Sequence, residues 1–404
     1  MVTPEYNPLA PEMHTDPYPL YRQLREEDPV HWSEPMEAWV LTRYDDVVGV
    51  LKSPRFSADR KRARNRFAQL ASAMQEDAGP LGRATTMLSA DPPEHTRLRG
   101  LVSKAFTMRM VEAMRPHIQE ITDDLLDAVG SSSSFDLIQD LAYPLPVIVI
   151  AEMLGVPPED RDEFKRWSDD LAATLGGPFV APDVLERART SAQEMADYFR
   201  GVIAERRREP REDLLSGLIA AEERGEVLSE DELLATCMLL LAAGNETTTN
   251  LIGNGMVALL RHPDQLRKLQ QDFSLIEPAV EEFLRYDGPV TSTARVAMEE
   301  LEIGGKAIEE GRLVLTVLAA ANHDPAQFSN PEELDITRQD NRHVAFGFGT
   351  HFCLGAPLAR VEAQIAFTAL LRRWPKLQLA SAEVEWGPSF ILRGPKSLPI
   401  VVGA

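Results

Sequence analysis

Cysteine and positive charge are both scarce in this chain. Only two cysteines occur among 404 residues, Cys237 and Cys353, so we expect no disulfide framework and a reducing cytoplasm. The net charge of −21 argues against nucleic acid or an anionic membrane surface as a partner. The longest apolar stretch, 233–244, is too short to cross a bilayer, and the polar N-terminus has no signal-peptide core.

Linkers, internal repeats and low-complexity runs are absent from the sequence as well. Length alone would allow two or three domains. The apolar content of 44% is enough for one large core. We therefore expect one domain, mainly helical from about residue 92 onward, with a small β-rich lobe.

The glycine-rich turn 346–355 is the most informative segment. It reads FGxGxHxCxG, with Cys353 just ahead of an amphipathic helical pattern that Pro357 begins and Pro375 ends. Free N–H groups at a helix N-terminus favour a thiolate, so Cys353 is a candidate metal ligand. A lone cysteine is more often a buried structural residue, but this array is too specific for that interpretation.

A polar cluster interrupts the long apolar helix expected over 229–261. Within it, Glu246 with Thr247 places an acid beside a hydroxyl. Glycine and consecutive threonines are poor helix formers, so the sequence predicts a local widening of the helix here. The alternative is a solvent-facing polar patch, which the flanking apolar residues disfavour.

Two weaker motifs lie on either side of this helix. Glu282 and Arg285 stand at i and i+3, which alone would indicate only a surface ion pair. His95 and Arg99 share one face of a helix that starts at two prolines, and two cationic donors suit an anion. A capped surface helix is an equally good interpretation of that second pattern without context.

In this order, the motifs HxxxR, AGxET, ExxR and FGxGxHxCxG resemble the cytochrome P450 family, bacterial class I type without a membrane anchor. The resemblance spans nearly the whole chain. It implies a single cytochrome P450 fold around a buried haem b (iron protoporphyrin IX), with Cys353 as the iron ligand. Thiolate ligation pushes electron density toward the iron and favours O–O cleavage.

The resemblance also implies roles for individual residues. Thr247 would hydrogen-bond the distal oxygen, and Glu246 would feed protons from solvent. Glu282, Arg285 and a third partner would hold the fold around the haem; Arg338 is our choice, with Arg342 as the alternative. The residues expected around the haem are His95, Arg99, Arg295 and His351 at the propionates, and Ala243, Gly244, Phe346, Gly347 and Gly355 near the iron and its ligand loop.

The predicted organisation follows the same resemblance. We expect a β-rich N-terminal part (1–60), a substrate-covering loop (60–90), a helical core (92–286), strands and a meander (287–345), the haem-ligand loop (346–355) and a C-terminal helix with strands (356–404). Within the core we expect helices over 95–111, 112–130, 140–154, 159–175, 183–208, 213–222, 229–261, 263–272 and 276–286.

Substrate contacts follow from family position only. The candidates are Met87, Leu88, Leu171, Leu175, Phe179, Leu239, Ala243, Thr247, Val290, Thr293, Phe390 and Ile391. They suit a small apolar substrate such as a lipid, terpenoid, steroid or polyketide, and do not choose among these. The basic run 52–66 reads as a solvated loop, with contact to an anionic substrate or carrier as a weaker hypothesis.

The implied function is monooxygenation with O₂ and electrons from NAD(P)H, delivered by a separate ferredoxin and ferredoxin reductase. We expect a cytoplasmic monomer. A peroxide-driven oxidase and a non-catalytic haem-binding protein are the alternatives, and the Glu246–Thr247 pair disfavours both. An acidic ferredoxin would meet a basic patch on the cysteine side, for which the candidates are Arg97, Lys104, Arg109, Arg360, Arg372 and Arg373.

Overall fold

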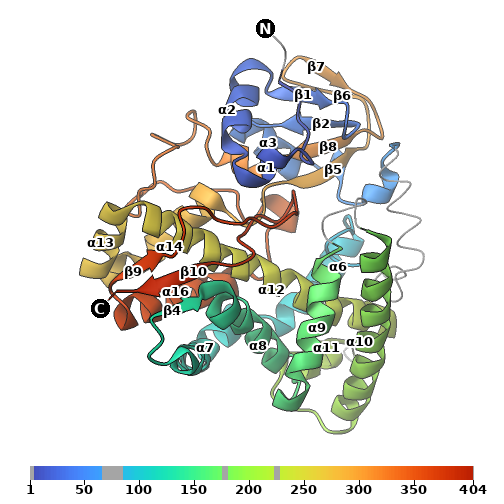
Figure 1. Ribbon diagram of the computed structural model, residues 1–404. Helices are drawn as coiled ribbons and strands as arrows, with labels where there is room; N and C mark the ends of the chain where they lie inside the picture. Colours follow the sequence, from blue (N-terminus) through green and yellow to red (C-terminus); the bar gives the residue numbers. More distant parts are fainter. Residues whose placement is uncertain (1–3, 66–84, 175–180, 223–227, 404) are drawn as a thin grey trace. The chain divides into compact units, whose positions relative to one another are not determined.

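The structure is a computed structural model that describes residues 4–65, 85–174, 181–222 and 228–403 (Figure 1). Its contacts form two compact units, each assembled from segments far apart in the sequence. The first unit comprises Met1–Phe56, Arg115–Leu145 and Thr247–Ala404, and the second comprises Ser57–Met114 and Pro146–Glu246. The long helix α12 (Glu230–Arg261) passes from one to the other.

Three small sheets build the β structure. The largest has the order β1–β2–β8–β5–β3, the second β4–β10–β9, and the third is the pair β6–β7. Strand bounds are β1 Val30–Ser33, β2 Ala38–Leu41, β3 Phe56–Ser57, β4 Ser134–Asp136, β5 Thr293–Ala297, β6 Leu301–Ile303, β7 Lys306–Ile308, β8 Leu313–Thr316, β9 Leu377–Leu379 and β10 Pro399–Val402. The strands predicted in the N-terminal part and after the C-terminal helix are present.

Strands β2 and β8 form a parallel pair, joined by a long crossover, within an otherwise antiparallel neighbourhood of β1, β2, β8 and β5. Val40 faces His31 of β1 in antiparallel register and Leu315 of β8 in parallel register. Trp32 and Trp39 are cross-strand neighbours with ring centroids 5.5 Å apart, which stabilises the hairpin. The sheet packs on α3 (Tyr44–Lys52) through buried apolar side chains such as Val47 and Val314.

The remaining helices of the first unit surround this sheet and the C-terminal strands (Figure 1). Their bounds are α1 Pro11–Thr15, α2 Tyr18–Glu27, α7 Met108–Val129, α13 Pro263–Gln271, α14 Ile276–Asp287, α15 Leu318–Ala321 and α16 Ala356–Arg373. Proline at the first turn starts several of them, because a missing N–H costs nothing there. The start of α7 belongs to the second unit.

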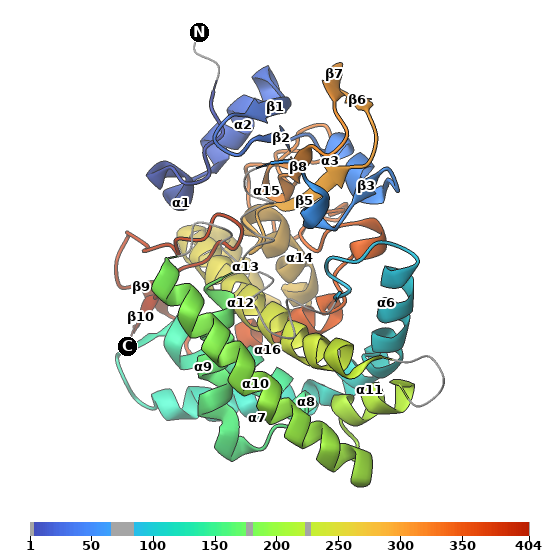
Figure 2. The ribbon, with the colours of Figure 1, turned by 90° about the vertical axis from the view of Figure 1, so that its right-hand side faces the viewer.

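The second unit is built almost entirely from helices. They are α6 Glu94–Ala105, α8 Pro144–Met153, α9 Arg161–Ala172, α10 Pro182–Arg208, α11 Leu214–Glu222 and the first half of α12. Figure 2 shows α9 running alongside α10, where Phe164 and Phe199 meet edge to face at 5.7 Å. Gly217 brings α11 against α6, because a Cβ there would lie 3.2 Å from that of Ala105.

Helix α12 corrects one prediction: it is a continuous α-helix without a widening at 243–249. Two polar side chains of this stretch bond to other elements. Asn245 donates to Ser168 Oγ at 2.9 Å, and Thr249 donates to the Ala142 carbonyl at 3.0 Å. The only π-turn of the described residues is Ile138–Ala142, which receives that second bond.

Two helix boundaries and one region also differ from expectation. The helix predicted over 95–111 ends at Ala105, because Thr107 accepts a hydrogen bond from the Met110 N–H and caps the next helix. The predicted 140–154 helix begins as the π-turn before α8. The N-terminal part contains three helices beside its short strands, so "β-rich" overstated it. Among the described helices, none has the length and apolarity needed to span a bilayer.

Candidate active site

The loop 346–355 is fixed by its own backbone. The Cys353 N–H donates to the Phe346 carbonyl at 2.9 Å, and a 3₁₀ turn over Gly349–His351 separates the two. Gly347 and Gly349 have φ near +70°, a region that favours glycine. A Cβ at Gly349 would also lie 2.7 Å from the Leu51 carbonyl of α3. Gly349 is therefore required by the turn and by its packing on α3.

The two cysteines have opposite environments. Cys353 is exposed at the end of this loop, two residues before Gly355, the N-cap of α16. Cys237 is buried inside α12, and burial raises the pKa of its thiol to about 12. A thiol that does not ionise is a poor metal ligand, so only Cys353 is suited to binding.

The middle of α12 has partly exposed residues on one side and buried residues on the other. Leu239, Ala243, Glu246 and Thr247 follow helical spacing, and all are partly or fully exposed, while Met238 and Leu241 are buried. A Cβ added at Gly244 would meet nothing within 4 Å. Glu246 and Thr247 are thus half-buried neighbours on this face of α12, and the local widening of the helix that the sequence predicted beside them is absent.

Glu246 titrates near neutral pH. Burial, and secondly the nearby carboxylate of Asp169, raise the pKa of Glu246 to about 7. The Asn245–Ser168 hydrogen bond brings the two acids close, because each is the next residue along its helix. A carboxyl group with this pKa can both give and take a proton at neutral pH.

A second buried acid was missed by sequence reasoning. Glu362 of α16 is 2% exposed, its Oε1 has no hydrogen-bond partner among the described residues, and it contacts Thr248 of α12. Burial raises the pKa of Glu362 to about 8. The signal was available, since Glu362 is a charged residue between Val361 and Ala363 in an apolar helix.

The Glu282–Arg285 pair is the most buried ion pair among the described residues. Arg285 donates through Nε and Nη2 at 2.8 Å each, and Arg338 Nε adds a third bond at 3.0 Å. Arg285 also donates to carbonyls of the meander, which fixes that loop. The alternative partner, Arg342, is exposed and pairs with Asp340, so the geometry selects Arg338.

The predicted anion donors come from both units. His95 is buried and Arg99 half-buried, four residues apart on α6. Arg295 is buried in β5, where its Nη1 donates to the Ala294 carbonyl at 2.8 Å, and His351 ends the 3₁₀ turn before the cysteine.

The substrate candidates are only partly described. Leu175 and Phe179 lie outside the described residues. Leu171 is buried in α9, whereas Leu88 is 58% exposed and Met87 half-buried. The remaining candidates, Val290, Thr293, Phe390 and Ile391, are half-buried in the first unit.

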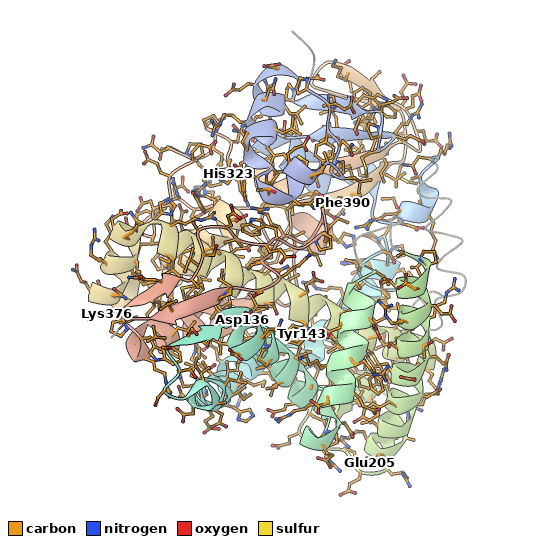
Figure 3. All side chains as sticks on the ribbon, in the orientation of Figure 1. Asp136, Tyr143, Glu205, His323, Lys376 and Phe390 are labelled. Atoms are coloured by element: carbon orange, nitrogen blue, oxygen red, sulfur yellow. The ribbon has the colours of Figure 1, made fainter. Side chains whose placement is uncertain are left out.

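Phe390 and Ile391 are held by the chain around Val290. Thr291 Oγ1 donates to the carbonyl of Phe390, labelled in Figure 3, at 2.6 Å. The Thr291 N–H donates to the Ile391 carbonyl at 2.9 Å, and Val290 bridges to Leu392. Hydrogen bonds therefore join the chain segments around Val290 and around Phe390. Four of the predicted substrate residues, Val290, Thr293, Phe390 and Ile391, lie in or directly beside these two segments.

The proposed basic patch is largely neutralised. Arg97 pairs with Glu94 and Glu232, Arg360 with Glu281, and Arg373 with Asp127. Arg372 lies over the Phe273 ring at 5.0 Å. The patch expected from the sequence therefore presents less positive charge than its composition suggested.

Comparison with known proteins decides the family. The family described as "Cytochrome P450" matches residues 31–383. The chain belongs to the cytochrome P450 family. A curated relative, the cytochrome P450 monooxygenase PikC of Streptomyces venezuelae, is 45% identical over 97% of this chain and 92% of its own length.

Comparison with solved structures gives the same family. The bacillaene polyketide synthase cytochrome P450 PksS of Bacillus subtilis superposes with a TM-score of 0.91 at 41% identity, covering 99% of this chain and all of that one. P450BioI, solved with a hexadec-9Z-enoic acid ligated acyl carrier protein, gives 0.87 at 39% identity, covering 96% and 98%. The protein is therefore a haem-thiolate monooxygenase of the bacterial P450 type.

The residues present fit the haem that membership implies. An exposed thiol stands on a loop that its own backbone hydrogen bond fixes. Among the described residues no cluster of three or more His, Cys, Asp or Glu could hold a bare metal ion. A single thiolate suits an iron whose other ligands come from a macrocycle.

Proposed function

We propose that Cys353 binds haem b as a thiolate and that the protein inserts one atom of O₂ into an apolar small molecule, by hydroxylation or epoxidation. The observation that carries the proposal is the exposed Cys353 thiol, fixed by the Phe346 carbonyl and followed by the N-terminus of α16. When bound, the haem supplies the activation of dioxygen. His95, Arg99, Arg295 and His351 would hold its propionates.

The chain's own residues would manage the protons. Glu246, with a pKa of about 7, would take a proton from solvent and pass it toward the Thr247 hydroxyl. Thr247 lies on the partly exposed side of α12 and would position that proton at the reacting oxygen. Ala243 and Gly244 would leave the space that substrate and oxygen need beside the helix.

Electrons would come from NAD(P)H through a ferredoxin reductase and a ferredoxin. Two cysteines are too few for an iron–sulfur cluster held by four, so a separate carrier is needed. Given the pairing described above, Arg109 is the remaining candidate for docking on the second unit, since no ion pair of the described residues engages it. Charge reversal at Arg109 should slow reduction at low salt, and an unchanged rate would count against this docking.

An acyl or polyketide-type substrate is the proposed class. Support comes from the relatives, one a polyketide synthase P450 and one solved with an acylated carrier protein. The basic turn Arg60–Arg62 offers exposed cations for an acidic carrier, because Arg60 and Lys61 form no ion pair among the described residues. Spin-state titration with a free long-chain fatty acid, the same acid on acyl carrier protein, and a steroid would rank the three classes.

The carbon monoxide difference spectrum of the reduced protein tests the central proposal. A red-shifted Soret band of the thiolate type is expected, and Cys353→Ser should abolish it while Cys237→Ser leaves it intact. A histidine-type band, or no haem binding, would overturn the proposal. Product formation with hydrogen peroxide alone, at the rate seen with O₂ and reductant, would favour the peroxide-driven alternative.

A further inference from the structure

A second charge cluster surrounds the cysteine loop, next to the Glu282 network but separate from it. Glu281 of α14 accepts from Arg360 of α16 through Nε at 2.6 Å and Nη2 at 2.8 Å, a bidentate pair. The Nε2 of His343 lies 3.1 Å from the same carboxylate. We call Glu281, His343 and Arg360 the loop clamp.

The loop clamp reaches both arms of the cysteine loop. His343 precedes the loop, and its Nδ1 accepts the Ala345 N–H at 3.2 Å. Arg360 follows the loop, and its guanidinium lies over the Phe346 ring at 4.6 Å. Phe346 in turn provides the carbonyl that accepts the Cys353 N–H. One carboxylate thus connects both ends of the loop to α14.

The hydrogen bonds define the protonation of the clamp. Because His343 Nδ1 accepts from a backbone N–H, its Nε2 carries the proton that is donated to Glu281. Burial raises the pKa of Glu281, but the bonds from Arg360 and His343 outweigh it and hold that pKa at about 2. The carboxylate is therefore ionised across the working pH range of the protein.

The side chains of the loop clamp are more buried, and its carboxylate has more donors, than in an ordinary surface ion pair. The Glu281 and Arg360 side chains are each 28% exposed and the His343 side chain only 4%. A partly buried, bidentate pair with a third donor loses less to solvent screening than an exposed one. In contrast, Glu277, one turn earlier on α14, is exposed and forms no ion pair among the described residues.

We propose that Glu281, His343 and Arg360 are positioning residues that keep the Cys353 loop in its thiolate-binding conformation. The inference rests on the proposed ligation by Cys353. Loss of the clamp would free Phe346 and loosen the Phe346–Cys353 hydrogen bond. The thiolate would then be protonated or displaced more easily, while the Glu282 network would still hold the meander.

The test follows the carbon monoxide complex of the holoenzyme during titration with urea. Glu281→Gln and His343→Gln are compared with wild type and with Glu277→Gln as the matched control. Helical circular dichroism, recorded on the same samples, reports global unfolding. We expect the ratio of thiol-type to thiolate-type complex, at urea concentrations below unfolding, to rise roughly tenfold in Glu281→Gln. His343→Gln should show a smaller rise, and Glu277→Gln none.

The test distinguishes failure of the proposed Cys353 ligation from failure of the loop clamp. If wild type shows no thiolate band, the proposed ligation fails, and the clamp with it. If wild type shows the band and both variants lose it only together with helical dichroism, the clamp is merely structural and the inference is wrong. Loss of the band before helicity, in His343→Gln even if Glu281→Gln does not fold, supports the inference.

Discussion

Buried carboxylates occur in two kinds of environment in this protein. One kind is surrounded by cationic donors, and the other has no ion pair among the described residues. Glu282 is fully buried and accepts bonds from Arg285, Arg338 and Asn341 and from the Asp335 N–H. Glu246 and Glu362 form no ion pair among the described residues, and burial raises their pKa values to about 7 and about 8.

The surrounding donors, and not burial itself, decide what such an acid can do. A carboxylate matched by guanidinium groups stays charged and holds segments together. One buried without a cation exchanges protons near neutral pH. Glu246 of α12 and its neighbour Glu362 can therefore exchange protons near neutral pH, while Glu282 of α14 acts as a brace. Four predictions test this division, from the largest expected effect to the smallest.

Arg285→Met should destabilise the protein most. It leaves the buried Glu282 carboxylate short of two donors and frees three meander carbonyls, at a cost of about 3–5 kcal/mol. Urea unfolding measures the loss. Arg342→Met is the matched control, because that exposed arginine should contribute less than about 1 kcal/mol. Equal effects of the two changes would contradict the division.

Glu362 should make stability depend on pH. Its folded pKa of about 8 lies above the ordinary glutamate pKa of 4.5, so the unfolded chain releases this proton first as pH rises. The free energy of unfolding should therefore fall between pH 5 and 9, by about 4 kcal/mol from this group. Glu362→Gln should flatten the curve by that amount. An unchanged slope would show that Glu362 is solvated or paired in solution.

Glu246→Gln and Thr247→Ala should impair turnover and leave the fold intact. Loss of a positioned proton donor lowers kcat by about 10²-fold. Dioxygen would then be reduced without oxygenating substrate, which is measured as peroxide released per NAD(P)H consumed. Thr236→Ala is the control on the same helix, since the Thr236 hydroxyl donates only to the Glu232 carbonyl one turn away. Full coupling in Thr247→Ala would exclude the relay.

Asp169→Asn should give the smallest effect. Removing that charge lowers the pKa of Glu246, so the limb on which kcat falls with rising pH should move to lower pH, by less than about one unit. The pH dependence of kcat measures it. Asp170→Asn is the control, because Asp170 is already paired with Ser191 and Arg187. A shift of equal size in both variants would mean a general charge effect.

Much of the fold could be predicted from residues close together in the sequence. The helix predicted over 263–272 and the C-terminal helix after Cys353 were predicted nearly to the residue, because prolines and apolar spacing act locally. The widening of α12 was predicted wrongly, since the local penalty of glycine and threonine gave no view of Ser168 and Ala142, which bond its polar side chains.

The residues of the candidate site also divide into those that the sequence predicted and those that only the structure revealed. Motif order and spacing identified Cys353, Glu246, Thr247 and the Glu282–Arg285 pair. The choice of Arg338 over Arg342 is settled only by contact, because both lie at similar distance along the meander. Glu362 and the loop clamp were not predicted at all, as the partners Glu281 and His343, Glu281 and Arg360, and Glu362 and Thr248 are 62 or more positions apart in the chain.

The sequence by itself determined the family, the cysteine that stands ahead of a helix and the acid–alcohol pair, since each is a property of neighbouring residues. Only the tertiary structure decided which buried carboxylates are charged. That depends on whether a guanidinium from a distant segment reaches the acid, as Arg338 and Arg360 do and as none of the described arginines does for Glu246 or Glu362. A charge buried in a low dielectric is stabilised only by partners within a few ångströms, and folding alone brings them there.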